Sequence, residues 1–231
     1  MPARNGDRRG PRLAIVAALT LGLIATPSGA ALRSPQVQVA PNALANFFAS
    51  RGQTINVVGD QLDLPFLSLD AGTTIELRVP LGTSGAVAFG GYNALLAVPP
   101  LYQMFPEFTP MNWFTIAAFR DLPSRVVINS FDAVGSLIGV NTYLGADRTA
   151  FGFYAGSASG AVYSEDARNP SGQPRILAYA ATGAVAGSMW FACELTQPNG
   201  YFGDLVVLAT FSTPPVGTKR TTWGRLQRLY R

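Results

Sequence analysis

The feature that most constrains the fold is a succession of short β-rich runs, beginning at residue 55 and continuing to residue 211. Val, Ile, Phe, Tyr and Thr are concentrated in these runs, and Gly, Pro, Asn and Asp separate them, as in strands joined by turns. We therefore expect a mostly β protein, an antiparallel β-sandwich of jelly-roll-like type. The expected strands are residues 55–58, 73–79, 113–119, 125–131, 136–143, 150–154, 175–180, 188–194 and 205–211.

One short N-terminal helix is expected at residues 42–51. Asn42 can cap it, and Gly52 suits the position after its last turn. Leu44, Phe47 and Phe48 recur at helical spacing and form its apolar face. Residues 31–213 are expected to form a single sandwich domain, a size at which sandwiches commonly remain undivided.

The alternation of side chains predicts how individual strands are covered. Residues 73–79 alternate between polar and apolar, so this strand should have one wet face. Residues 113–119 and 205–209 are apolar on both faces and should lie in the middle of a layer. The proline-rich segment 95–110 is expected to be a long ordered loop or edge region. Its aromatic residues should cover the open end of the core: Tyr102, Phe105 and Phe108.

Residues 1–30 have the pattern of a secretory signal peptide. A basic start precedes an apolar run at residues 13–25, which is too short to span a bilayer, and small residues at 28–30 complete the cleavage pattern. The mature chain should therefore begin near Ala31 and be secreted, extracellular or periplasmic, with no transmembrane segment. The basic C-terminal tail, residues 214–231, is either an amphipathic sorting or surface-binding segment or a frayed end.

The charge of the mature body argues against a nucleic-acid partner. The chain has 17 Lys and Arg residues. Many of these lie in the expected signal peptide and in the tail, so the body carries more carboxylates than arginines. A mildly acidic body lacks the basic patch that nucleic-acid binding requires.

Composition also removes much familiar catalytic chemistry. The chain has no histidine and only one cysteine, Cys193. A Ser-His-Asp or Cys-His arrangement, a histidine-ligated metal site and an intramolecular disulfide are therefore excluded. The single lysine, Lys219, lies in the tail. Paired carboxylates are the remaining catalytic option, and the candidates are Asp60, Asp63, Glu76, Glu194 and Asp204.

Five motifs recur in the order and spacing of a known family. They are Phe151-Gly152-Phe153-Tyr154, the run from Tyr163 to Pro170, Ile176-Leu177-Ala178-Tyr179, the run from Trp190 to Leu195, and Gly203-Asp204-Leu205-Val206-Val207. This stretch, residues 151–211, resembles the domain of unknown function 4114 family, which is found in secreted bacterial proteins.

The resemblance implies an acidic loop ahead of the last of these strands, with oxygen ligands that suit calcium. In this chain Glu194 and Asp204 match two of the acids and Asn199 lies between them, whereas further acids of the family pattern are missing. The expectation is therefore no cofactor, or weakly bound calcium at Glu194, Asn199 and Asp204. A second cluster, Glu165, Asp166 and Asn169, is expected to build an Asx-type turn rather than a metal site.

Two classes of function follow. The first is an exported, non-catalytic module of the envelope or matrix, with a cell-surface polysaccharide or an envelope component as partner. Its candidate aromatic platforms are Tyr92, Tyr102, Trp113 and Tyr201, each of which can alternatively belong to the core. The second is a small carboxylate-dependent glycoside hydrolase or lyase, which needs two acids about 5–10 Å apart.

Overall fold

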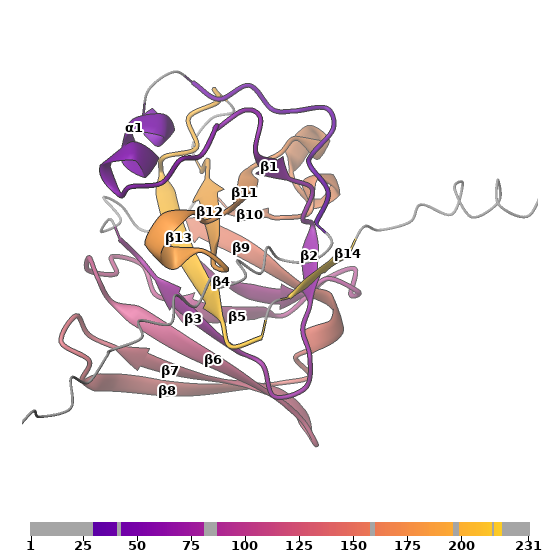
Figure 1. The fold of residues 1–231 in the computed structure, drawn as a ribbon. Coiled ribbons are helices and arrows are strands. Elements are labelled where there is room, and N and C mark those ends of the chain that lie inside the picture. Colours follow the sequence, from indigo (N-terminus) through magenta and orange to yellow (C-terminus); the bar gives the residue numbers. More distant parts are fainter. Residues whose placement is uncertain are drawn as a thin grey trace, which may run out of the picture.

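Two antiparallel sheets pack face to face in the computed structural model (Figure 1). It describes residues 30–40, 43–80, 87–157, 160–195, 199–213 and 215–218. The expected signal peptide apart from Ala30, together with Asn42 and most of the basic tail, therefore lies outside the described residues. One sheet has the strand order β1-β11-β12-β13-β3-β6-β7-β8, and the other β14-β2-β9-β4-β5 with β10 paired to β9. The mostly β sandwich is thus confirmed, and the chain crosses repeatedly between its sheets as in a jelly-roll-like fold.

The described elements are short, as the turn-rich sequence predicts. The strands are β1 (Gln61–Leu62), β2 (Phe66–Ser68), β3 (Thr74–Arg78), β4 (Ala88–Asn93), β5 (Leu101–Phe105), β6 (Phe114–Asp121), β7 (Ser124–Phe131), β8 (Leu137–Leu144), β9 (Phe151–Ser157), β10 (Gly160–Tyr163), β11 (Ile176–Ala180), β12 (Met189–Cys193), β13 (Leu205–Phe211) and β14 (Val216–Thr218). The helices are α1 (Ala43–Ser50) and the 3₁₀ turns η1 (Arg148–Ala150), η2 (Asp166–Arg168), η3 (Pro170–Gly172) and η4 (Gly183–Val185). Of the described helices, none combines the length and the apolarity needed to cross a bilayer.

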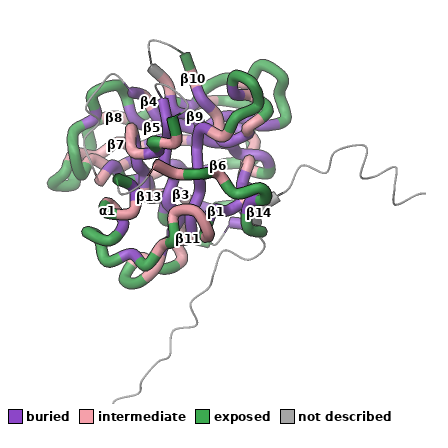
Figure 2. The backbone as a smooth tube through the Cα atoms, turned by 90° about the horizontal axis from the view of Figure 1, so that it is seen from above, coloured by how far each residue is buried: buried purple, intermediate pink, exposed green. Residues whose placement is uncertain are grey.

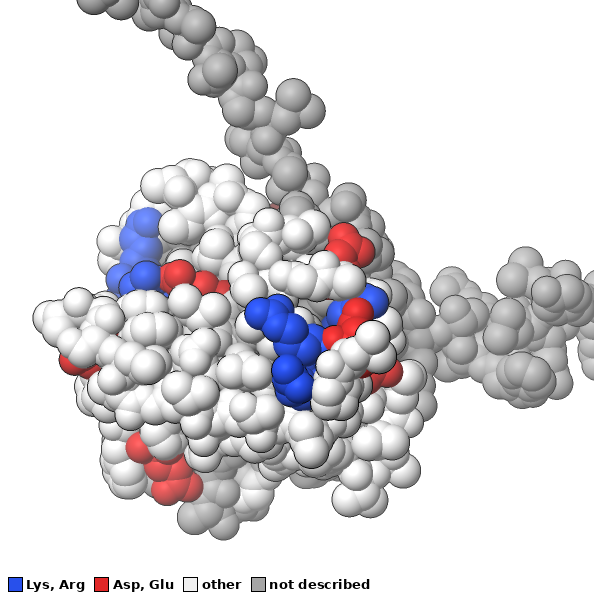
Figure 3. All heavy atoms as spheres, turned by 90° about the horizontal axis from the view of Figure 1, so that it is seen from below, with Lys and Arg blue, Asp and Glu red and all other residues white. Residues whose placement is uncertain are grey.

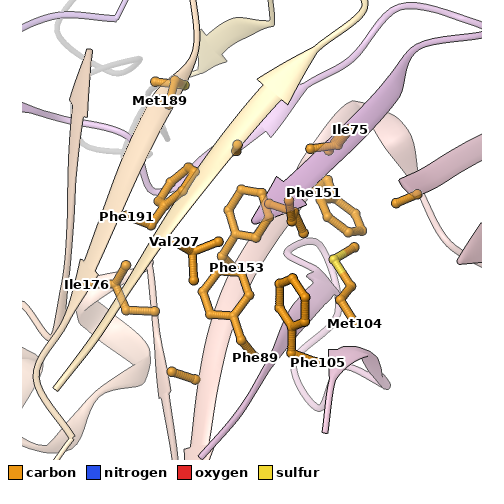
Figure 4. Close-up of a cluster of buried hydrophobic side chains, with 14 of the residues drawn as sticks. Ile75, Phe89, Met104, Phe105, Phe151, Phe153, Ile176, Met189, Phe191 and Val207 are labelled. Carbon is orange, nitrogen blue, oxygen red and sulfur yellow. The ribbon is translucent and has the colours of Figure 1, made fainter. Parts of the chain in front are cut away.

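The main core lies between the two sheets. Phe89, Phe153 and Phe191 converge there from different strands, and the ring centroids of Phe153 and Phe191 are 4.4 Å apart (Figure 4). The buried backbone runs through the middle of the molecule, and the exposed segments are mostly connecting loops (Figure 2). Apolar burial of this kind is the dominant stabilising term for a domain that has no disulfide. Cys193 is buried with a free thiol.

Helix α1 covers the outer face of β11, β12 and β13 (Figure 1). Leu44 and Phe48 are its buried residues, and Phe48 contacts the ring of Trp190. The N–H of Gln53 donates to the carbonyl of Phe48, and Gly52 has a φ of 67°. This is the left-handed ending that glycine permits at low cost, and it confirms the expected helix stop.

Most of the expected strands are present, but residues 55–58 do not form one. Asn56 Oδ1 accepts hydrogen bonds from the N–H groups of Val58 and Gly59, and Asp60 Oδ2 accepts one from the N–H of Asn56. The short polar side chains therefore satisfy the local backbone in a turn, in competition with a strand ladder. The strand prediction was wrong here for that reason.

Segment 95–110 was expected to be a long ordered loop or an edge region, and its strand β5 confirms the edge region. Strand β5 forms the edge of the six-stranded sheet and lies between Pro100 and Pro106, as an edge strand permits. Tyr102 and Phe105 are buried in the core as expected, whereas Phe108 is 68% exposed. Phe108 therefore does not cover the core.

Candidate functional site

The inner face of β6, β7 and β8 changes from apolar to polar along the strands. Three successive rows of paired residues cross these strands: Phe119, Val126 and Tyr143; Ala117, Ile128 and Asn141; and Thr115, Ser130 and Gly139. Directly paired residues point to the same side of a sheet. The last row therefore continues the face that builds the core, but with small and polar side chains.

A groove of about 330 Å³ lies between this polar row and the end of β5. Gln103 and Phe105 of β5 line one side, and Trp113, Ser130 and Asn141 line the other. An added Cβ atom at residue 139 would meet no atom within 4 Å, so the pairing of Gly139 with Ser130 leaves open space at this end of the sheet. We call this hollow the β5–β8 groove.

Thr115 is the unusual residue of the β5–β8 groove. Thr115 is among the residues that line the groove and is only 1% exposed, and its Oγ1 is buried without a hydrogen-bond partner among the described residues. A buried hydroxyl without a partner costs about 1–3 kcal/mol, and most buried polar atoms in folded proteins are paired. As a hydroxyl, Thr115 Oγ1 can both donate and accept a hydrogen bond, and in this structure it does neither with a described residue.

The residues that line the groove carry no charge. They combine two side-chain amides, two hydroxyls and the Trp113 indole with apolar surface. On the side of the molecule where β7 and β8 lie, charged side chains form a few separate groups and uncharged atoms cover most of the surface (Figure 3). This chemistry suits an uncharged ligand that has both hydroxyl groups and apolar faces.

The expected calcium residues lie together in the loop between β12 and β13. Glu194 Oε1 accepts hydrogen bonds from the N–H groups of Asn199, at 2.8 Å, and Tyr201, at 3.0 Å. Asp204 Oδ2 accepts one from the N–H of Leu195, at 2.7 Å. These oxygen atoms are thus directed at backbone donors of their own loop.

Calcium requires about six to eight oxygen ligands. The described residues contain no group of three or more acids or cysteines placed to hold a metal ion. As they lie here, Glu194, Asn199 and Asp204 do not fit such a site, and weak calcium binding stays a prediction. Burial raises the pKa of the adjacent Cys193 thiol, and the Asp204 carboxylate raises it further.

The second cluster, Glu165, Asp166 and Asn169, forms a turn. The N–H of Asn169 donates to the backbone carbonyl of Asp166, which closes η2. Glu165 is ion-paired with Arg168, and Asp166 with Arg33. The Asn169 amide then holds the turn through hydrogen bonds to the backbone of Tyr163 and Gln173. These contacts give the cluster a structural role.

The five candidate catalytic acids are distributed over the eight-stranded sheet. Asp60 and Asp63 flank β1, whereas Glu76 lies on β3 and is ion-paired with Arg78. Strands β1 and β3 are four strand spacings apart in the sheet order, or roughly 19 Å. That lateral separation exceeds the distance between the two carboxylates of a glycosidase. The other two acids, Glu194 and Asp204, bind the backbone of the β12–β13 loop.

The structure places the four expected aromatic platforms in different environments. Tyr92 and Tyr102 are 0% and 1% exposed, so they belong to the core and cannot serve as platforms. Tyr201 is 42% exposed and belongs to the β12–β13 loop. Trp113 is half-buried and lines the β5–β8 groove. Of the four, Trp113 is the one that the structure brings into a hollow.

Sequence reasoning missed four residues of the groove, namely Thr115, Ser130, Asn141 and Gln103. A signal was present, because Thr115 is a polar residue at an inward position of the otherwise apolar segment 113–119. The pairing of Thr115 with Ser130 and of Ser130 with Gly139 depends on strand register, which the sequence did not specify.

No protein-family profile matches the chain, and no curated protein gives a significant match. The resemblance to the domain of unknown function 4114 family therefore rests on its motifs and stays a prediction.

Proposed function

We propose that the chain is an exported, non-catalytic module that binds a neutral glycan of the cell envelope or matrix in the β5–β8 groove. The observation that carries the proposal is the buried, unpartnered hydroxyl of Thr115 in the lining of an uncharged groove. A sugar hydroxyl can satisfy Thr115 Oγ1 as donor or as acceptor.

The neighbouring side chains extend the same chemistry. The amides of Gln103 and Asn141 each offer donors and an acceptor, and Ser130 adds a second hydroxyl. The Trp113 indole has a large apolar face, on which the C–H face of a sugar ring can pack. The groove lining lacks the arginine or lysine that an acidic polysaccharide would need, so we propose a neutral glycan.

Location and activity are part of the proposal. The signal-peptide pattern of residues 1–30 supports export. The carboxylates of Glu194 and Asp204 are hydrogen-bonded to the backbone of their loop, which supports a binding role rather than hydrolysis. A hydrolase or lyase would instead release new reducing ends from the glycan.

Calorimetric titration with soluble α-glucan, β-glucan and mannan tests the proposal. We expect one of these neutral polymers to bind, and Trp113→Ala to abolish binding because the platform is lost. Thr115→Val should weaken binding about tenfold, the equivalent of one hydrogen bond. The same variant should be at least as stable as the wild type, since valine removes the unsatisfied hydroxyl. A purely structural role for Thr115 would not separate affinity from stability in this way.

Matched controls lie on the opposite face of the same sheet. Thr142→Val and Asn129→Ala change residues whose strand neighbours Asn141 and Ser130 line the groove, so these two residues point away from it. Both variants should bind as the wild type does, whereas Asn141→Ala should bind more weakly. Absence of binding to every neutral polymer, or equal effects of the groove and control variants, would refute the proposal. Release of reducing sugar would establish the catalytic alternative.

A further inference from the structure

Strand β8 forms an open edge of the eight-stranded sheet (Figure 1). Among the described strands it pairs with β7 alone. It is eight residues long, Leu137–Leu144, and none of these residues is charged or a proline. Val140 is 55% exposed and Leu144 is 69% exposed. An open edge presents backbone N–H and C=O groups to another strand, and proteins usually shield a long edge with lysine, proline or a covering segment.

The other edge strands of the described residues are shorter or flanked by proline. Strands β1, β14 and β10 have two, three and four residues. Strand β5 has five residues and lies between Pro100 and Pro106. Short strands and flanking prolines both limit pairing with a further strand. Within the described part of the chain, β8 is therefore the long edge without such protection.

The hydrogen bonds to β7 show which residues of β8 direct their backbone groups to the open side. The N–H of Gly145 donates to the carbonyl of Ser124, in the register that pairs β7 with β8. Hydrogen-bonded and non-hydrogen-bonded pairs alternate along an antiparallel ladder, so every second residue counted back from Gly145 bonds to β7. This regular ladder ends where the register shifts, between Ser130 and Phe131 of β7. Within it, the residues whose N–H and C=O groups point away from β7 are Val140, Thr142 and Leu144.

We propose that β8 pairs antiparallel with β8 of a second copy of the chain, about a twofold axis that passes beside Thr142. The three residues with open backbone groups then pair with one another. Thr142 lies opposite Thr142 of the second copy, and Val140 lies opposite Leu144. Residues paired in this way exchange backbone hydrogen bonds, so the two eight-stranded sheets continue into each other.

The backbone of the edge selects a β-strand as the occupant. Each of the three open residues has one N–H donor and one C=O acceptor to satisfy. An extended segment supplies a matching row of acceptors and donors, as in the addition of a strand to a sheet edge. The surface of a lipid bilayer supplies no such row.

The side chains select a second copy as the source of that strand. A twofold interface requires a surface that is complementary to itself. The pairing of Val140 with Leu144 joins two exposed apolar side chains, and the pairing of Thr142 with itself joins two hydroxyls, both of which are favourable cross-strand pairs. Because β8 has no charged residue, the pairing involves no like-charge repulsion, and the strand offers no charge that would recruit a foreign partner.

Light scattering of the full chain, after size-exclusion chromatography at a series of concentrations, tests the proposal. We expect a dimer that dissociates on dilution. Thr142→Lys should raise the dissociation constant about tenfold or more, because two lysines then face each other. Leu122→Lys is the matched control, since Leu122 is 93% exposed in the separate turn between β6 and β7. This control should dimerise as the wild type does.

A charge-swap experiment tests the register. Thr142→Asp alone should dissociate as Thr142→Lys does, because two aspartates then face each other. An equimolar mixture of the two variants should form a heterodimer, because each lysine then faces an aspartate. A register that did not place residue 142 opposite itself would not give this rescue. Failure of the mixture to associate would therefore contradict the proposed pairing.

A proline variant separates backbone pairing from side-chain contact. The N–H of Thr142 points away from β7, so Thr142→Pro removes no hydrogen bond of the monomer's own ladder, and proline is tolerated at such edge positions. We expect a monomer with the circular dichroism spectrum of the wild type. Thr142→Val keeps the N–H and should remain a dimer. A dimer that persists in Thr142→Pro would refute pairing through β8.

The remaining outcomes also decide the question. A wild type that stays monomeric at every concentration, or equal dissociation of Thr142→Lys and Leu122→Lys, would overturn the proposal. These measurements contain no glycan, and Thr142 points away from the β5–β8 groove. The proposed dimer and the proposed glycan binding therefore fail independently.

Discussion

Gln53 Oε1 accepts a hydrogen bond from the indole Nε1 of Trp190 at 3.1 Å, and this contact joins the end of α1 to the middle of the eight-stranded sheet. The same oxygen accepts from the N–H of Thr182 at 2.8 Å, and Gln53 Nε2 donates to the Thr182 carbonyl. Gln53 is 7% exposed. One buried amide therefore pairs with the Trp190 indole and with both backbone groups of Thr182.

Replacing this amide should be costly. Gln53→Leu leaves the Trp190 and Thr182 donors without their acceptor, and we expect the free energy of unfolding to fall by about 2–4 kcal/mol. Urea denaturation followed by circular dichroism measures the change. Gln38→Leu, at an exposed glutamine, is the control and should stay within about 0.5 kcal/mol of the wild type. Similar stabilities for the two variants would contradict the prediction.

Stability should decline in alkali. Burial raises the pKa of Tyr92, Tyr154 and Tyr179 well above the ordinary value for tyrosine, and burial likewise raises that of Cys193. In each case the folded state favours the neutral form, whereas the unfolded chain ionises near pH 8.5 for cysteine and near pH 10 for tyrosine. The stabilisation is thus complete below about pH 8 and is lost as pH rises.

The slope of this decline can be measured. Above the unfolded pKa each group removes about 1.4 kcal/mol per pH unit from the free energy of unfolding. Urea titrations between pH 7 and pH 11 should therefore show a plateau followed by a steep fall. Tyr179→Phe should reduce the slope, because it removes one of the buried groups whose pKa is raised. A free energy that stays level to pH 11 would count against the burial argument.

The Glu194 carboxylate should stabilise its loop without calcium. Glu194→Ala removes the acceptor for the N–H groups of Asn199 and Tyr201, and we expect a loss of about 2–3 kcal/mol because these bonds are charge-assisted. Glu107→Ala, at an exposed acid, serves as the control. Thermal unfolding of the two variants and of the wild type gives the comparison.

Calcium itself should have little effect on the wild type. The described carboxylate oxygens of the loop bind backbone N–H groups, so millimolar calcium and chelator should give closely similar melting curves. A calcium-dependent gain of about 1–3 kcal/mol that disappears in Asp204→Asn would instead establish the weak site implied by the family resemblance.

Two glycines in strands should respond in opposite ways to alanine. A Cβ at residue 91 of β4 would lie 1.9 Å from Cζ of Phe151, which is fully buried, whereas one at residue 139 of β8 meets nothing within 4 Å. Gly91→Ala should cost about 1–3 kcal/mol or more through overpacking. Gly139→Ala should be neutral or stabilise by about 0.5–1 kcal/mol. Chemical denaturation measures both, and a tolerated Gly91→Ala would show that the Phe151 ring can move aside.

The local sequence pattern was sufficient to predict burial wherever polar and apolar side chains alternate. In β3, Ile75 and Leu77 are buried while Glu76 between them is half-buried, as the alternation predicts. The end of α1 at Gly52 was likewise predictable, because the left-handed conformation there is a property of one residue. Nearest-neighbour chemistry determines such features, so a single sequence contains them.

Tertiary packing determines the strands that local propensity disfavours. Strand β4 contains Gly90 and Gly91, which weaken a strand on their own account, yet Gly91 is needed because the Phe151 ring occupies the place of a side chain. Strand β5 is held at a sheet edge despite its flanking prolines. These strands form because partners distant in the sequence supply ladder bonds and buried surface.

The site residues show the same division between what the sequence predicts and what the fold determines. Residue types alone indicated a chain without histidine chemistry and with an aromatic candidate at Trp113. Only the register of β6, β7 and β8 brings Thr115, Ser130 and Asn141 beside that indole. A sequence determines which groups exist, whereas long-range pairing determines which of them meet, because a shift of one residue in register turns every side chain to the other face.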